Sequence, residues 1–145
     1  MKLVANPLFY LIVFTILIIT CVFLFPGLNI IHFQLAGLPF LILGIYMIFN
    51  AYFSFKDNDT SVKFGKSYRL VKEGLYKYSR NPMYLGMIAI LVGISLLSGN
   101  ILSFVFPILF FLIMQYMFIP YEEEKLEAVF GKLYIDYKKE VRRWI

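Results

Sequence analysis

The residue types that could do chemistry gather in two polar segments set between apolar stretches. The first contains Ser79-Arg80-Asn81-Pro82, and the second is Glu122-Glu123-Glu124. Charged residues at the ends of apolar stretches are expected to be functional, because a membrane makes such residues costly to keep. An arginine beside a helix start can bind a carboxylate or a phosphate, and a glutamate can accept hydrogen bonds from hydroxyl groups.

Several other kinds of chemistry are not indicated. The single histidine, His32, and the single cysteine, Cys21, lie on distant segments, so we expect no metal site. The sequence has no glycine-rich phosphate loop and no metalloprotease or Ser-His-Asp pattern. The net charge of +5 comes mostly from basic residues that flank apolar stretches. Anionic lipid head groups are the nearer partner there, so we expect no nucleic-acid binding.

The composition predicts an all-α integral membrane protein. The chain is 61% hydrophobic with a mean hydropathy of +0.76, well above a soluble domain. Apolar stretches cover residues 8–25, 33–53, 84–97 and 101–119, which predicts about four transmembrane helices. We expect one domain over residues 1–145: two spans in 1–53, a cytoplasmic segment in 54–83, a helical hairpin in 84–119 and a cytoplasmic amphipathic tail in 120–145.

The distribution of charge predicts the orientation of the spans. Residues 54–83 hold seven lysines and arginines against three acids, whereas the connectors at 26–29 and 98–100 hold no charge. Basic loops stay on the cytoplasmic side, so we expect both termini and the polar motifs to face the cytoplasm in a multi-pass protein. In the tail, apolar residues recur at steps of three or four, which predicts an amphipathic helix at the membrane interface. These residues are Leu126, Phe130, Leu133, Tyr137, Val141 and Trp144.

The elements that position the two polar segments can also be predicted. Asn81 before Pro82 is typical of an N-cap followed by proline at the first helical position, so the third helix should begin there. The short connector at 98–100 makes the third and fourth helices an antiparallel hairpin, which returns both polar segments to a similar depth. Arg80 and Glu122-Glu123 should therefore be neighbours.

Other residues of the hairpin predict its packing and its lining. Gly86 and Gly93 put small residues on one stripe of the third helix, so a neighbouring helix can approach closely. Pro107 predicts a kink that opens a cavity in the fourth helix. Gln115, with Tyr116, is the polar pair that would line the substrate side of that cavity.

The motifs together resemble a known family. The segment from Leu70 to Gly86 includes Arg80-Asn81-Pro82-Met83-Tyr84-Leu85-Gly86, and Glu122-Glu123 follow after one hairpin. With Leu126, Phe130-Gly131, Tyr134, Tyr137 and Val141-Arg142, this order resembles the isoprenylcysteine carboxyl methyltransferase and phospholipid methyltransferase family, whose usual pattern is Arg-His-Pro-x-Tyr-x-Gly and then Glu-Glu. The resemblance covers residues 59–143. Asn81 replaces the common histidine, as in bacterial members, and Leu75 replaces a frequent proline, so the substrate is left open.

The resemblance implies S-adenosylmethionine as the cofactor and a lipid-like or prenylated methyl acceptor. The implied catalytic residues are Arg80, Glu122 and Glu123. The implied cofactor-binding residues are Tyr76, Arg80, Asn81, Pro82, Tyr84, Gly86, Glu122 and Glu123. An acceptor carboxylate needs no base, whereas an amine must lose a proton that a glutamate could take. The location implied is a bacterial cytoplasmic membrane, where membrane lipids are partners, and the small core is compatible with a homodimer.

Two other functions stay open at this level. A membrane oxidoreductase of the sterol-reductase kind resembles this family in its membrane core and would bind NADPH at a similar place, although it has more spans. A non-catalytic membrane interaction protein would use Arg80 and the glutamates only as a structural ion pair. The tyrosines of the motif could likewise be interfacial aromatics.

Overall fold

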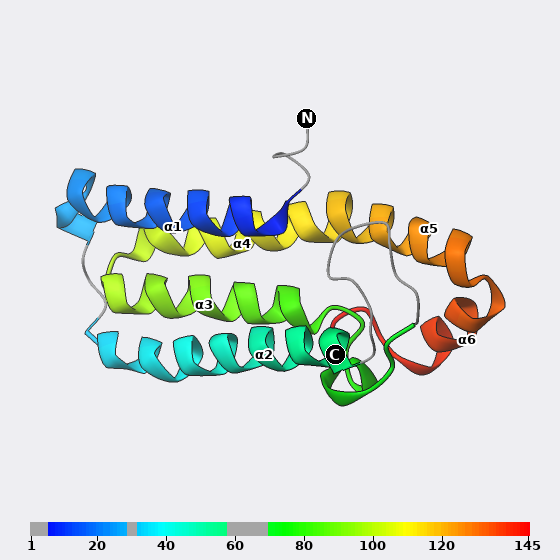
Figure 1. Cartoon of the computed structure of the whole chain (residues 1–145). Helices are drawn as coiled ribbons and strands as arrows, with labels where there is room; N and C mark the ends of the chain where they lie inside the picture. Colours follow the sequence, from blue (N-terminus) through cyan, green and yellow to red (C-terminus); the bar gives the residue numbers. More distant parts are fainter. Residues whose placement is uncertain (1–5, 29–31, 58–69) are drawn as a thin grey trace.

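The computed structural model describes residues 6–28, 32–57 and 70–145, and the secondary-structure elements in them are helices (Figure 1). The long ones are α1 (Pro7–Leu24), α2 (Gly37–Asp57) and α3 (Pro82–Ser98). The fourth long helix comprises α4 (Val105–Ile113), a π-helical turn (Met114–Phe118) and α5 (Ile119–Phe130), and is called helix α4–α5. Short 3-10 helices at Pro26–Leu28, Gln34–Ala36, Gly74–Lys77 and Ile101–Phe104 occupy the connections, and α6 (Lys132–Glu140) follows Gly131.

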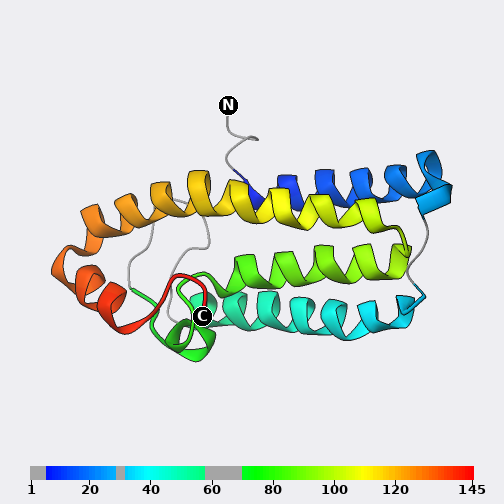
Figure 2. The same ribbon diagram turned by 180° about the vertical axis from the view of Figure 1, so that it is seen from behind.

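The long helices form two antiparallel pairs. α1 packs along α4, and α2 packs along α3, as both views show (Figures 1 and 2). Contacts between α1 and α3 join the two pairs. The buried core lies at this junction and comprises Phe14, Ile18, Tyr84, Met87, Leu91, Phe110, Met114, Phe118 and Ile119.

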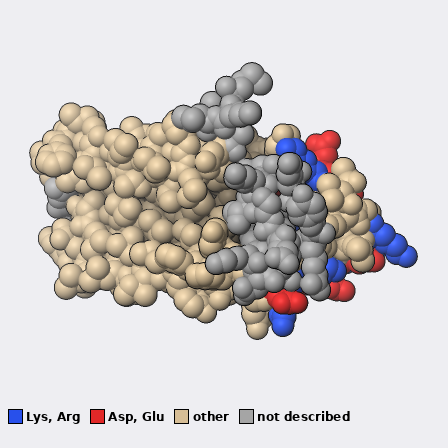
Figure 3. Space-filling model, in the orientation of Figure 1, with Lys and Arg blue, Asp and Glu red and all other residues tan. Residues whose placement is uncertain are grey.

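The helices are suited to a membrane. Among the described residues, three helical segments are long and apolar enough to cross one: Pro7–Leu24, Gln34–Ser54 and Ile101–Phe130. α3 is a shorter apolar helix of 17 residues. Large apolar side chains such as Ile12, Phe23 and Ile42 are exposed on the outside. On the face shown in Figure 3, the Lys, Arg, Asp and Glu side chains gather at the end of the molecule that holds α5, α6 and the segment before α3.

Glycines set the close contact between α2 and α3. A Cβ atom at Gly44 would lie 2.5 Å from the Gly86 carbonyl oxygen, and one at Gly86 would lie 2.7 Å from the Gly44 carbonyl oxygen. Gly37 and Gly93 meet in the same way further along the pair. The predicted small-residue stripe is confirmed, and the helix that approaches it is α2.

A polar cluster closes the hairpin at the end far from α6. Asn100 is fully buried; its Nδ2 donates to the Phe25 carbonyl oxygen at 2.9 Å, and its Oδ1 accepts from the Leu102 amide at 3.0 Å. Ser103 Oγ donates to the Asn100 carbonyl oxygen at 2.6 Å. These bonds satisfy polar groups that would be costly in an apolar setting, and they tie the α3–α4 connection to the end of α1.

One expectation about the helices needs correction, and another stays a prediction. Pro107 lies in the first turn of α4, and the kink expected there stays a prediction. Further along this helix lies an irregular turn, the π-helical Met114–Phe118. A single tail helix over 120–145 is not found, because the helix ends at Phe130, Gly131 adopts a φ of +51°, and the chain turns back through α6. Part of the predicted basic segment, residues 58–69, lies outside the described residues.

Candidate active site

The start of α3 forms one wall of the site. α3 begins at Pro82 with Asn81 at the N-cap, as predicted, but the Asn81 side chain does not cap the helix. Its Nδ2 donates instead to the Arg143 carbonyl oxygen at 2.9 Å. The Arg80 amide donates to the Arg142 carbonyl oxygen at 3.0 Å. The helix start is therefore joined to residues 141–144, which we call the strap.

An ion cluster of three residues holds the two polar segments together. Arg80 Nη1 lies 2.8 Å from Glu123 Oε1, and both side chains are only 10% exposed. Arg143, 30% exposed, donates to the same carboxylate from Nε at 3.1 Å and from Nη2 at 2.8 Å. The predicted proximity of Arg80 and Glu123 is confirmed. Arg143 was missed, although the Val141-Arg142 element of the family pattern adjoins it.

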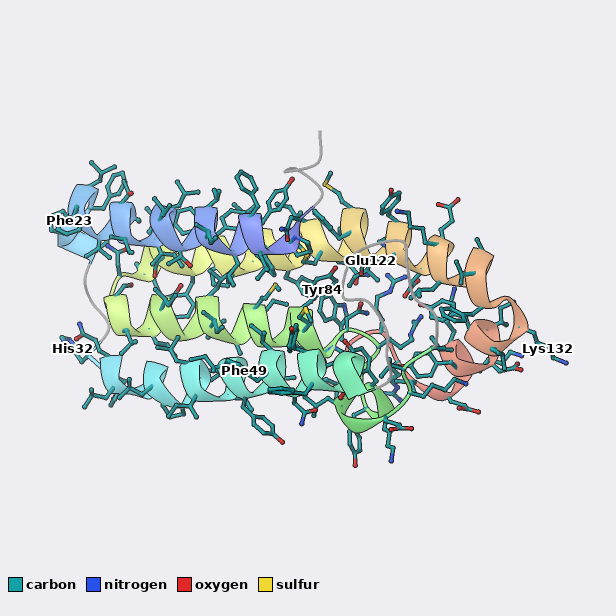
Figure 4. All side chains as sticks on the ribbon, in the orientation of Figure 1. Phe23, His32, Phe49, Tyr84, Glu122 and Lys132 are labelled. Atoms are coloured by element: carbon teal, nitrogen blue, oxygen red, sulfur yellow. The ribbon has the colours of Figure 1, made fainter. Side chains whose placement is uncertain are left out.

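Glu122 faces a different partner. The Tyr84 hydroxyl donates to Glu122 Oε1 at 2.6 Å, and Figure 4 shows these side chains pointing toward each other between α3 and α5. Among the described residues, no hydrogen bond is made to Glu122 Oε2. The two adjacent glutamates therefore differ, because Glu123 pairs with two arginines while Glu122 has an oxygen that accepts no hydrogen bond from a described residue.

The Arg80 guanidinium also has an unused donor. Its Nε is buried and has no hydrogen-bond partner among the described residues. A buried N–H of a charged group without an acceptor is costly, so this group calls for an acceptor that the described residues do not supply. Arg80 and Glu122 thus present an unused donor and an unused acceptor at the same end of the bundle.

Two tyrosines of α6, Tyr134 and Tyr137, form a second wall of the site. The Tyr137 hydroxyl donates to the Tyr76 carbonyl oxygen at 2.7 Å, which ties α6 to the segment before α3. Burial, with the negative charge of Glu123, raises the pKa of Tyr134 to about 12, and Arg80 opposes part of this rise. Burial and the neighbouring Tyr134 also raise the pKa of Tyr137. Both hydroxyls therefore stay protonated at neutral pH.

The other residues that the sequence predicts for the site differ in whether they lie beside Arg80 and the glutamates. Tyr76 and Pro82 are buried beside it, whereas Gly86 lies at the α2 contact and acts on packing. Gln115 accepts a hydrogen bond at Oε1 from Trp144 Nε1 at 2.7 Å, which connects it to the strap. Tyr116 is 72% exposed on the outside of the helix, so the structure brings Gln115 and not Tyr116 toward the site.

A comparison with known families covers the residues of this site. The family model for phospholipid methyltransferases matches residues 33–133, which include Arg80, Tyr84 and both glutamates. The chain belongs to the phospholipid methyltransferase family. Arg143 and Trp144 lie beyond the matched range of this family model.

Three curated relatives of this phospholipid methyltransferase family member are named as protein-S-isoprenylcysteine O-methyltransferases. The Schizosaccharomyces pombe protein is 34% identical over 75% of this chain and 48% of its own length. The Saccharomyces cerevisiae protein is 36% identical over 82% of this chain and 54% of its own length. The Arabidopsis thaliana protein, of the B type, is 31% identical over 81% of this chain and 61% of its own length. The chain thus spans about half the length of these relatives, and no solved structure gives a significant match.

Proposed function

We propose that this chain is an integral membrane methyltransferase that uses S-adenosylmethionine and a lipid-like or prenylated acceptor. The observation that carries the proposal is the pair of unused groups at the charged end of the bundle. Arg80 Nε has no acceptor, and Glu122 Oε2 accepts no hydrogen bond from a described residue. Membership of a methyltransferase family supports the same reading.

The polar groups present fit the two ends of this cofactor. Arg80 Nε would donate to the carboxylate of its methionine part, which is the anionic acceptor that a buried guanidinium prefers. Glu122 would accept from the ribose hydroxyls through Oε2, while Tyr84 fixes its Oε1 at 2.6 Å. Glu123 would act as a positioning residue, because its carboxylate already receives Arg80 and Arg143. Asn81 and Tyr76 would complete the walls.

When bound, S-adenosylmethionine would supply a methyl group on a positively charged sulfur. An acceptor lone pair would bond to the methyl carbon, and the sulfur would leave with the electron pair of the broken C–S bond. The residues of the chain need only hold the two reactants in line and exclude water. An acceptor carboxylate is already ionised at neutral pH. An acceptor amine must lose one proton, which would pass to water, because both Glu122 oxygens and the Glu123 carboxylate would already have partners.

We place four spans in the cytoplasmic membrane of a bacterium, with the site on the cytoplasmic side. α3 would be the fourth span, because it runs beside the full-length α2 and meets it at Gly44 and Gly86. Its 17 residues give a length of roughly 25 Å at 1.5 Å per residue, which spans most of a hydrocarbon core. The acceptor chain would enter from the bilayer and the cofactor from the cytoplasm.

Calorimetric titration of the purified full chain with S-adenosylhomocysteine tests the proposal. We expect saturable one-site binding, which Arg80→Ala reduces at least tenfold because a buried charged donor is lost. Arg142→Ala is the matched control, since that arginine is exposed and contributes its backbone carbonyl. Binding of NADPH in place of S-adenosylhomocysteine, or equal binding by Arg80→Ala, would overturn the assignment.

A further inference from the structure

Gln115 is an unusual residue in its helix. Between Val105 and Ile119 the side chains are apolar except for Gln115 and Tyr116, and both lie in the π-helical turn. Tyr116 points outward, but Gln115 is half-buried. An amide in an apolar segment is costly unless it has a hydrogen-bond partner, and π-helical turns are frequent at functional sites.

The strap supplies that partner. Trp144 Nε1 donates to Gln115 Oε1 at 2.7 Å, and its ring centroid lies 5.0 Å from that of Phe111. The indole thus brings a hydrogen-bond donor and a flat apolar body to the apolar part of helix α4–α5. One residue earlier, Arg143 is bound to Glu123, so this position adjoins the candidate cofactor site.

These contacts limit what could replace the indole. If Trp144 left without a substitute, the Gln115 amide would remain in an apolar setting without its donor. A replacing ligand must therefore carry an N–H or O–H donor at one end and an apolar body at the other. A lipid with such a head group has both parts.

We propose that Trp144 occupies the head-group position of the methyl acceptor on Gln115, and that an amphiphile with a donor in its head group displaces it. This inference rests on the proposed function and adds Trp144 as a residue that determines specificity. A lipid whose head group has no N–H or O–H donor cannot replace the indole on Gln115. The geometry thus selects acceptors by a hydrogen bond as well as by their apolar chain.

The single tryptophan of the chain allows a direct measurement. The full chain in nanodiscs is titrated with N-acetyl-S-farnesylcysteine and with lysophosphatidylethanolamine, both of which carry N–H donors. An alkylphosphocholine of the same chain length is the control, because its head group has neither an N–H nor an O–H donor. We expect a saturable change in Trp144 emission with at least one donor probe and a smaller change with the control. No change with either donor probe, or an equal change with the alkylphosphocholine, would overturn the proposal.

Three variants sharpen the test, with radiolabelled probe binding as the readout. Trp144→Phe keeps a ring but removes the competing hydrogen bond, so it should bind the responding probe about two- to tenfold more tightly. Gln115→Leu should bind it correspondingly more weakly. Tyr116→Phe, an outward neighbour in the same turn, should bind as the wild type does. Unchanged binding by Trp144→Phe would contradict the displacement.

These measurements use neither the cofactor nor turnover. Failure of S-adenosylhomocysteine to bind would therefore overturn the proposed function without changing the Trp144 result. Conversely, a chain that binds S-adenosylhomocysteine but shows no Trp144 response would overturn only the head-group assignment.

Discussion

Replacing Glu123 by glutamine should destabilise the charged end of the molecule. Glu123 is the common partner of Arg80 and Arg143, through contacts of 2.8, 3.1 and 2.8 Å. Breaking a buried ion pair on one side typically costs about 3–5 kcal/mol. Glutamine keeps one acceptor oxygen and Arg143 is 30% exposed, so we expect the lower part of this range or slightly less, about 2–3 kcal/mol.

Thermal unfolding of the detergent-purified chain gives the measurement. For a chain of this length, 2–3 kcal/mol corresponds to a fall in Tm of about 6–10 °C. Glu124→Gln is the matched control, because Glu124 is adjacent and exposed, and its Tm should stay within about a degree of the wild type. If Glu123→Gln has the same Tm as the control, the ion cluster contributes nothing to stability, and Glu123 does not hold Arg80 and Arg143 together as we infer.

Two further predictions concern other parts of the structure. Gly86→Ala should lower the unfolding free energy by about 1–3 kcal/mol, because the added Cβ would lie 2.7 Å from the Gly44 carbonyl oxygen. Thermal unfolding measures this, and a Tm equal to that of the wild type would show that α2 and α3 can move apart to accept the extra carbon. Tyr84→Phe should weaken S-adenosylhomocysteine binding about fivefold, because Glu122 loses the hydroxyl that donates to its Oε1 at 2.6 Å. If calorimetry gives the same affinity for the variant and the wild type, Tyr84 does not belong to the site.

The features that could be predicted from the sequence are those encoded locally. Asn81-Pro82 marks the start of α3 because an N-cap and a proline at the first helical position are local preferences. The short hairpin fixes the depth of Arg80 relative to Glu123, so their contact follows from chain geometry. Gly86 and Gly93 signal close packing, although the sequence does not name α2 as the partner.

The features that were missed depend on contacts between distant residues. Arg143 reaches Glu123 because the chain reverses at Gly131, where a φ of +51° ends the helix that the apolar periodicity predicts to be continuous. The π-helical turn at Met114–Phe118 leaves no mark in the spacing of apolar residues. The role of Trp144 on Gln115 follows from both features, and so could not be predicted from the sequence pattern.

The glycine contact between α2 and α3 has a consequence for motion. Two helices whose backbones meet at Gly44 and Gly86 cannot slide past each other without a clash, so they move as one rigid unit. The buried Asn100 ties the far end of this unit to the end of α1. Arg80 lies just before α3 and Glu123 lies in α5, so their ion pair joins the two helix pairs at the opposite end of the molecule.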